Sequence, residues 1–82
     1  MPSYTTSDLA VAAALKTALH VLPEIHVRGR LCEFTFPIDQ AKAQQIVQQF
    51  YDDTLSLPLR RYAQDLRDLR SLIANAKEVQ GR

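Results

Sequence analysis

The architecture of this chain follows from residues 24–36, which read EIHVRGRLCEFTF. Apolar and polar side chains alternate on both sides of Gly29-Arg30, a pair that suits a two-residue type II′ hairpin turn. Two antiparallel strands joined by this turn place Val27 opposite Cys32. We therefore predict a β-hairpin with strands at residues 24–28 and 31–36.

The register of this predicted hairpin divides its side chains between two faces. The apolar face consists of Ile25, Val27, Cys32, Phe34 and Phe36, and the polar face of Glu24, His26, Glu33 and Thr35. Both strands alternate in the same phase, which a shift of one residue would destroy. Two strands alone are marginally stable. We expect a third strand from residues 3–6, from residues 54–57 or from another subunit.

Two shorter helices are predicted on either side of the hairpin. The first covers residues 7–22, with Ser7 as its N-cap and Pro23 at its end. Its alanines at positions 10, 12, 13, 14 and 18 favour a thin helix that a neighbour can approach closely. The second covers residues 38–51, with Asp39 as its N-cap. Its apolar stripe consists of Ala43, Ile46, Val47 and Phe50.

A third and longer helix is predicted over residues 58–79. Pro58 suits its first position, and Gly81 suits the position after its end. Apolar residues recur every three or four positions and form a seam of Leu59, Tyr62, Leu66, Leu69, Ile73 and Ala76. This seam suits packing on the hairpin and the other helices, and it also suits pairing with a second copy. Leu72 and Tyr62 widen the stripe beyond a strict seam, which favours core packing.

Size and composition predict one α+β domain over residues 1–82: a helix, a β-hairpin or small three-stranded antiparallel sheet, then two helices packed on one sheet face. A chain of 82 residues and 9.3 kDa has a small core, which makes a monomer marginal and a homodimer reasonable. Ten basic and nine acidic residues leave a net charge of +1. No global field is expected to attract nucleic acid or an anionic membrane, so an electrostatic site must be local.

Cysteine usage and hydropathy bear on the compartment. Cys32 is the only cysteine, which excludes an intramolecular disulfide and a cysteine-based zinc site. A reduced, cytoplasmic setting is the expectation. The N-terminus lacks the basic start and apolar stretch of a signal peptide. The longest apolar run covers residues 9–15, far short of the roughly 20 residues that span a bilayer, so no membrane partner is expected.

Basic charge is segregated on the predicted third helix. Its flank and outer face carry Arg60, Arg67, Arg70 and Lys77, whereas the opposite flank carries Asp65 and Asp68 with Arg61 between them. Such a stripe can contact the phosphates of nucleic acid. The alternative is an ordinary solvated face. No aromatic residue interleaves with the stripe for base stacking, and no helix-turn-helix is visible.

The first turn of the same helix holds Arg60 and Arg61, where the helix dipole favours acidic residues. Two arginines beside free backbone N–H groups can hold a phosphate or a carboxylate, which predicts a small-anion site. The alternative is that Asp52 and Asp53, just upstream, neutralise both arginines.

Residues suited to catalysis or metal binding are few. A metal cluster could draw only on His20, Glu24, His26 and Glu33, and a polar surface pair with a helix-end histidine explains them equally well. The predicted register puts Cys32 and His26 on opposite faces, which excludes a Cys–His dyad. Gly-rich phosphate loops are absent. We expect no enzyme activity, no cofactor and no metal.

Four short segments carry a family resemblance: YTTSDLAVAA at 4–13, FTF at 34–36, FY at 50–51 and LRDLRSLI at 66–73. With them the chain resembles a family of short prokaryotic and phage proteins known only as a domain of unknown function. The family tends to have Gly at the end of its first helix, where this chain has ALH at 18–20. It also tends to have a Gly-containing turn where this chain has Asp52-Asp53. The resemblance implies a fold and an accessory or mobile-element role, and transfers no catalytic residue.

These features predict a non-enzymatic interaction module that binds itself or another protein. A homodimer would use the seam of Leu59, Tyr62, Leu66, Leu69 and Ile73. The alternative is a nucleic-acid-binding accessory protein of phage or mobile-element type, which would use Arg60, Arg61, Arg67, Arg70 and Lys77.

Overall fold

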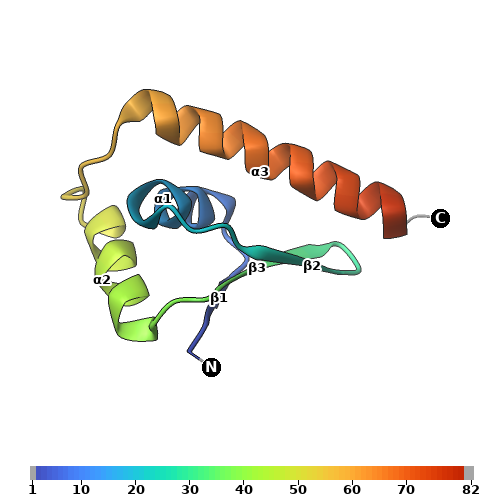
Figure 1. The fold of residues 1–82 in the computed structure, drawn as a ribbon, viewed down its shortest axis with the longest axis horizontal. Helices are drawn as coiled ribbons and strands as arrows, with labels where there is room; N and C mark the ends of the chain where they lie inside the picture. Colours follow the sequence, from blue (N-terminus) through green and yellow to red (C-terminus); the bar gives the residue numbers. More distant parts are fainter. Residues whose placement is uncertain (1, 81–82) are drawn as a thin grey trace.

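The structure is a computed structural model that describes residues 2–80, with side chains through Lys77. Six elements follow one another along the chain: β1 (Tyr4–Thr6), α1 (Leu9–Leu19), β2 (Glu24–Arg28), β3 (Leu31–Phe36), α2 (Gln40–Tyr51) and α3 (Leu59–Gln80). Figure 1 shows α1 and α3 on the same side of the β2–β3 hairpin. The predicted α+β class and element order are confirmed.

The three strands form one antiparallel sheet in the order β1-β3-β2. The predicted hairpin register is confirmed, since Val27 lies opposite Cys32. Gly29 has a φ of +62° whereas Arg30 has a negative φ, which is the pattern of a type II′ turn. The third strand comes from the first of the three predicted sources, because Tyr4 in β1 pairs with Phe36 in β3.

The sheet has one buried and one polar face. Phe34 and Phe36 are 1% and 0% exposed and face the core. The opposite face carries the hydroxyls of Thr5 and Thr35, whose Oγ1 atoms lie 3.0 Å apart. Alternation along the strands adds Glu24 to this polar face. Helices α1 and α3 lie on the apolar side of the sheet, and α2 packs against α1.

Helix α1 lies at the centre of the molecule and contacts the sheet, α2 and α3 (Figure 1). Its buried side chains are small, with Ala12 and Ala13 at 0% and Ala14 at 1% exposure. Leu15, also at 0%, is its one large buried side chain. Because alanine side chains are short, the sheet, α2 and α3 can all pack close to α1.

The ends of α1 differ from the prediction. The N-cap is Asp8 rather than Ser7, because Asp8 Oδ1 accepts the N–H groups of Ala10 at 2.9 Å and Val11 at 3.2 Å. The helix ends at Leu19 rather than at residue 22. His20 closes it in the left-handed conformation, with φ 55° and ψ 39°. The helix has therefore already ended when the chain reaches Pro23.

The other two helices begin one or two residues after the predicted positions. Asp39 is the N-cap of α2 as predicted, and its Oδ1 accepts the N–H of Ala41 at 3.0 Å. Pro58 precedes α3 instead of occupying its first position, and its carbonyl accepts the N–H of Tyr62 at 3.0 Å. Gly81, predicted to follow the helix, lies outside the described residues. Helix α3 passes α1 and continues toward the hairpin turn (Figure 1).

Candidate functional site

The apolar seam of α3 is largely occupied within the chain. Leu69 is 0% exposed, and Tyr62, Leu66 and Ile73 pack against the core that contains it. Tyr62 also donates its hydroxyl to the Ala10 carbonyl of α1 at 3.2 Å. Burial, with the nearby Asp8 carboxylate, raises the pKa of Tyr62 and keeps this hydroxyl protonated. The seam therefore packs in the core, as one of the two interpretations expected.

Leu59 is the exception in the seam, with 82% of its surface exposed. It borders an open groove of about 590 Å³ between the end of α2 and the start of α3, whose apolar lining consists of Phe50, Tyr51, Leu55, Leu57, Leu59 and Tyr62. Tyr51 is 65% exposed at its rim. We call this the apolar groove.

A buried polar cluster ties α3 to α1. Asp65 of α3 is 6% exposed, and its Oδ1 accepts Lys16 Nζ of α1 at 2.5 Å. Its Oδ2 accepts the Thr17 hydroxyl at 2.6 Å. The helical wheel places Asp65 on the solvated flank, so sequence analysis missed this cluster. One signal was present, since Asp65 borders the seam residue Leu66 and an oppositely charged lysine occurs on α1.

Two opposing effects act on the Asp65 carboxyl. Burial removes water and raises its pKa, while the hydrogen bonds from Lys16 and Thr17 and the charges of Lys16 and Arg61 lower it. The lowering effects are stronger, so the pKa of Asp65 falls below the usual 3.8. The cluster is therefore a satisfied ionic contact with an ionised carboxylate, and it is unsuited to general acid–base work at neutral pH.

The basic residues of α3 divide between two sides of the helix. Arg60, Arg67, Arg70 and Lys77 follow one side over about 25 Å, and we call them the basic stripe. All four are exposed, and none forms an ion pair among the side chains that the structure describes. Two acidic side chains of this helix that the structure describes are engaged elsewhere, since Asp65 binds Lys16 and Asp68 accepts a hydrogen bond from Gln64 at 2.9 Å.

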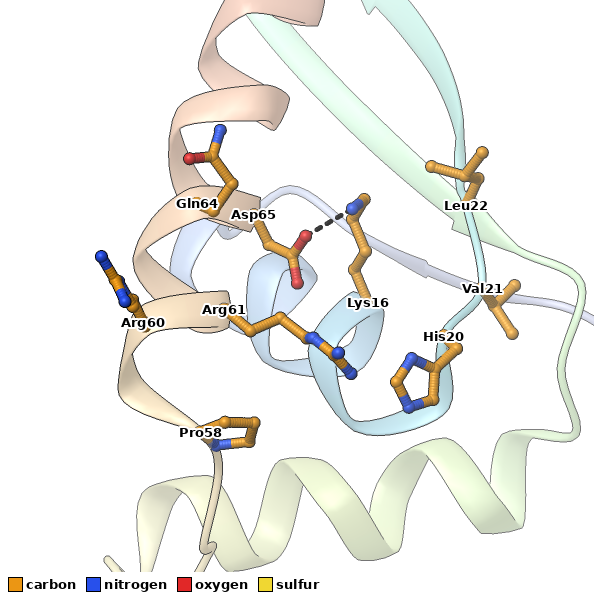
Figure 2. A pocket seen from close by; sticks show the side chains of 9 residues that line it. All are labelled: Lys16, His20, Val21, Leu22, Pro58, Arg60, Arg61, Gln64 and Asp65. Carbon is orange, nitrogen blue, oxygen red and sulfur yellow. Dashed lines mark hydrogen bonds and ion pairs between the residues drawn. The ribbon is translucent and has the colours of Figure 1, made fainter.

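Arg61 lies on the other side, in an open groove of about 890 Å³ between the end of α1 and the start of α3. We call this the cationic groove; its lining is Lys16, His20, Val21, Leu22, Pro58, Arg60, Arg61, Gln64 and Asp65. Figure 2 shows Arg61 pointing across the groove toward His20, whereas Arg60 points away from it. Of the two arginines predicted to act together, both line the groove but only Arg61 points into it.

The proposed neutralisation of these arginines by the upstream acids has no support in the described residues. Asp52 instead caps the end of α2 and accepts both hydrogen bonds from Gln48, at 3.1 Å. Asp53 takes a positive φ of 58°. No ion pair joins either aspartate to Arg60 or Arg61 within residues 2–77.

The candidate metal ligands do not gather at one place. His26 lies 3.5 Å from Glu24 on its own strand, and Glu33 pairs with Arg28 at 3.2 Å. In the part of the chain that the structure describes, no three histidine, cysteine or acidic side chains form a metal-binding group. Across the same residues, none of the helices has the length and hydrophobicity needed to cross a bilayer.

Comparisons of the chain with family models, curated proteins and solved structures found no match. The family resemblance therefore stays a prediction. Its two departures do share a backbone feature. The end of the first helix and the turn after Tyr51 hold the only non-glycine residues with positive φ in the described chain, His20 and Asp53. Glycine adopts this conformation without steric cost, and aspartate and histidine are among the side chains found in it more often than others.

Proposed function

We propose that this chain is a non-enzymatic module that binds the phosphate backbone of nucleic acid through the basic stripe. One observation carries the proposal: four exposed cations, which form no ion pair with any side chain that the structure describes, follow one side of a single helix for about 25 Å. Lys and Arg in this arrangement release counterions from phosphates and bind without regard to base sequence.

The distribution of acidic residues supports the proposal. Glu24 and Glu33 belong to the polar face of the sheet, away from the helices. Asp39 and Asp52 cap the two ends of α2. Although the net charge is only +1, positive charge is thus concentrated among the described side chains on the outer side of α3. A local field of this kind attracts a polyanion more than the net charge suggests.

The chemistry of the stripe favours nucleic acid over an anionic membrane. A helix that lies in a membrane surface needs an apolar face free to enter the lipid. The apolar side of α3 is instead packed in the core, with Leu69 at 0% exposure. No aromatic residue accompanies the stripe, so duplex phosphates fit it better than stacked single-stranded bases. A reduced cytoplasm, which the single Cys32 suits, would supply such a partner.

A titration of fluorescent duplex DNA by anisotropy at several salt concentrations tests the proposal. We expect log K to fall with log salt with a slope of about −3, as expected for three or four phosphate contacts. Arg67→Ala with Arg70→Ala should reduce the slope by about two. The matched control removes two exposed charges elsewhere, by Arg30→Ala with Lys42→Ala, and should change the slope little.

Three results would overturn the proposal. One is no binding at low salt. The second is an equal loss in both double variants, since binding would then depend on net charge alone. The third is binding to vesicles with anionic lipid and not to duplex DNA.

Self-association is a second candidate, supported by the apolar groove rather than by the seam. Two reasons for expecting a homodimer no longer apply, because the sheet obtains its third strand from β1 and most of the seam is packed in the core. Yet the chain exposes 5683 Å², more than the roughly 5,000 Å² expected for its mass. Leu59 and Tyr51 contribute apolar area at one site. A second copy that covers this groove would bury both.

Light scattering tests self-association. We expect a dimer at micromolar concentrations, and Leu59→Ser should convert it to a monomer. Leu31→Ser is the matched control, because Leu31 is also exposed, at 51%, but belongs to the hairpin. A wild-type monomer, or equal effects of the two variants, would contradict a dimer through the apolar groove.

A further inference from the structure

We propose that the cationic groove is a separate site for a small organic anion that carries an apolar group. The first observation is the placement of Arg61. Its guanidinium points across the groove toward His20 (Figure 2) and forms no ion pair with a described carboxylate. A guanidinium presents a planar fork of donors that matches the oxygens of a carboxylate or a phosphate.

Asp65, the carboxylate that lines the groove with Arg61, already has hydrogen-bond partners. Asp65 accepts Lys16 at 2.5 Å and Thr17 at 2.6 Å, so both of its oxygens have strong partners. The cluster fixes the wall of the groove and orients Lys16 at the same time (Figure 2). Arg61 therefore stays available to a ligand.

The charges that line the groove select an anion. Lys16 and Asp65 offset each other in their ion pair, and Arg60 points away from the groove (Figure 2), so the charge of Arg61 is left uncompensated among the described side chains. The start of α3 also contributes the partial positive charge of its free N–H groups. An anion is therefore favoured electrostatically, and Arg61 is the residue placed to contact it directly.

The opposite wall of the groove is apolar. Val21 and Leu22 line it, and Leu22 is 68% exposed, whereas Pro58 lies at the start of α3 beside the arginines (Figure 2). An inorganic ion would leave this wall in water, whereas an aliphatic or aromatic group would cover it. The groove volume of about 890 Å³ is in the range of small-molecule sites. The ligand class is thus a phosphate monoester or a carboxylate on an apolar group.

Arg60 belongs to the basic stripe and also borders the groove, but Arg61 points into the groove and Arg67 lies on a different side of α3, so the two sites can be tested separately. Chemical shifts in an NMR titration with phenyl phosphate test it. We expect saturable shifts confined to residues 16–22 and 58–65, with weaker binding of inorganic phosphate and none of phenol. A parallel titration with benzoate determines whether the groove prefers a carboxylate or a phosphate as the anionic group of its ligand.

Variants at two arginines separate this site from nucleic-acid binding. Arg61→Gln should weaken phenyl phosphate binding about tenfold or more, because a charge-assisted bidentate contact is lost. Arg67→Gln is the matched control and should leave it unchanged. Duplex DNA binding should respond to Arg67→Gln and not to Arg61→Gln. The proposal fails if phenyl phosphate gives no saturable shift, if it binds no better than inorganic phosphate, or if Arg67→Gln weakens it equally.

Discussion

The two sides of α3 use charge in opposite ways. On the side that faces α1, Asp65 is 6% exposed and is bonded to both Lys16 and Thr17. On the outer side, Arg67 and Arg70 are exposed and form no ion pair with any described residue. The same helix therefore carries one charge, on Asp65, that contributes to helix packing, and two charges, on Arg67 and Arg70, that make no ion pair with a described residue.

On a small domain, residues that maintain the fold and residues available for binding can be distinguished by the burial and pairing of their charges. A charge that is buried and paired contributes to stability, and removing its partner leaves an unsatisfied group. An exposed charge that no neighbour compensates contributes little to stability and stays available to a ligand. Substitutions on the side of α3 that faces α1 should change the free energy of unfolding, and substitutions on the outer side should change binding affinity.

The largest effect is expected from Asp65→Ala. The variant removes two short hydrogen bonds and leaves Lys16, which is 16% exposed, without its partner. We expect the free energy of unfolding to fall by about 2–4 kcal/mol in urea denaturation at neutral pH. Asp68→Ala is the control, because Asp68 accepts only one hydrogen bond, from exposed Gln64, and should cost under about 0.5 kcal/mol. Equal losses would remove the distinction between the two sides.

A double-mutant cycle measures the contact itself. Lys16→Met, Asp65→Ala and their combination should give a coupling energy of about 1–3 kcal/mol, because the two side chains touch at 2.5 Å. The same cycle for Arg67→Ala and Arg70→Ala should give a small coupling of opposite sign, since like charges three residues apart repel. Additive behaviour of Lys16 and Asp65 would show that their contact is energetically unimportant.

A smaller effect is expected from acid. The pKa of Asp65 in the folded chain lies below its usual 3.8, so its contribution to stability is fully present above that value. The contribution is lost as the pH falls below about 4 and through the lower pKa of the folded state. The difference in unfolding free energy between the wild type and Asp65→Asn should shrink over this range. A difference that stays constant from pH 7 to acid would contradict the ionised state.

The smallest effect on stability is expected from the basic stripe. Arg67→Ala with Arg70→Ala should change the free energy of unfolding by no more than about 0.5 kcal/mol, toward higher stability, because a repulsive pair is removed and alanine favours helix. Thermal unfolding followed by circular dichroism measures it. A loss above about 1 kcal/mol would assign these arginines a structural role.

The hairpin was predictable because its signals are local. Period-two alternation on both strands and Gly29 at the turn determine the register without knowledge of distant residues. The partner of Asp65 was not predictable in this way, since Lys16 lies 49 positions away and the contact depends on how α3 crosses α1. The different orientations of Arg60 and Arg61 (Figure 2) were not predictable either, because adjacency in the sequence suggested joint action.

The alanines of α1 determine which parts of this sequence can vary. Ala12 and Ala13 are fully buried against close neighbours, so one added methylene must displace packed atoms. Arginines on the outer side of α3 have no such neighbour. In a deep mutational scan selected for folding alone, the alanines would stay nearly invariant while the stripe diversified. A second scan selected for binding would retain the arginines of the basic stripe. The positions that tolerate substitution in the first scan but not in the second would then identify the functional surface.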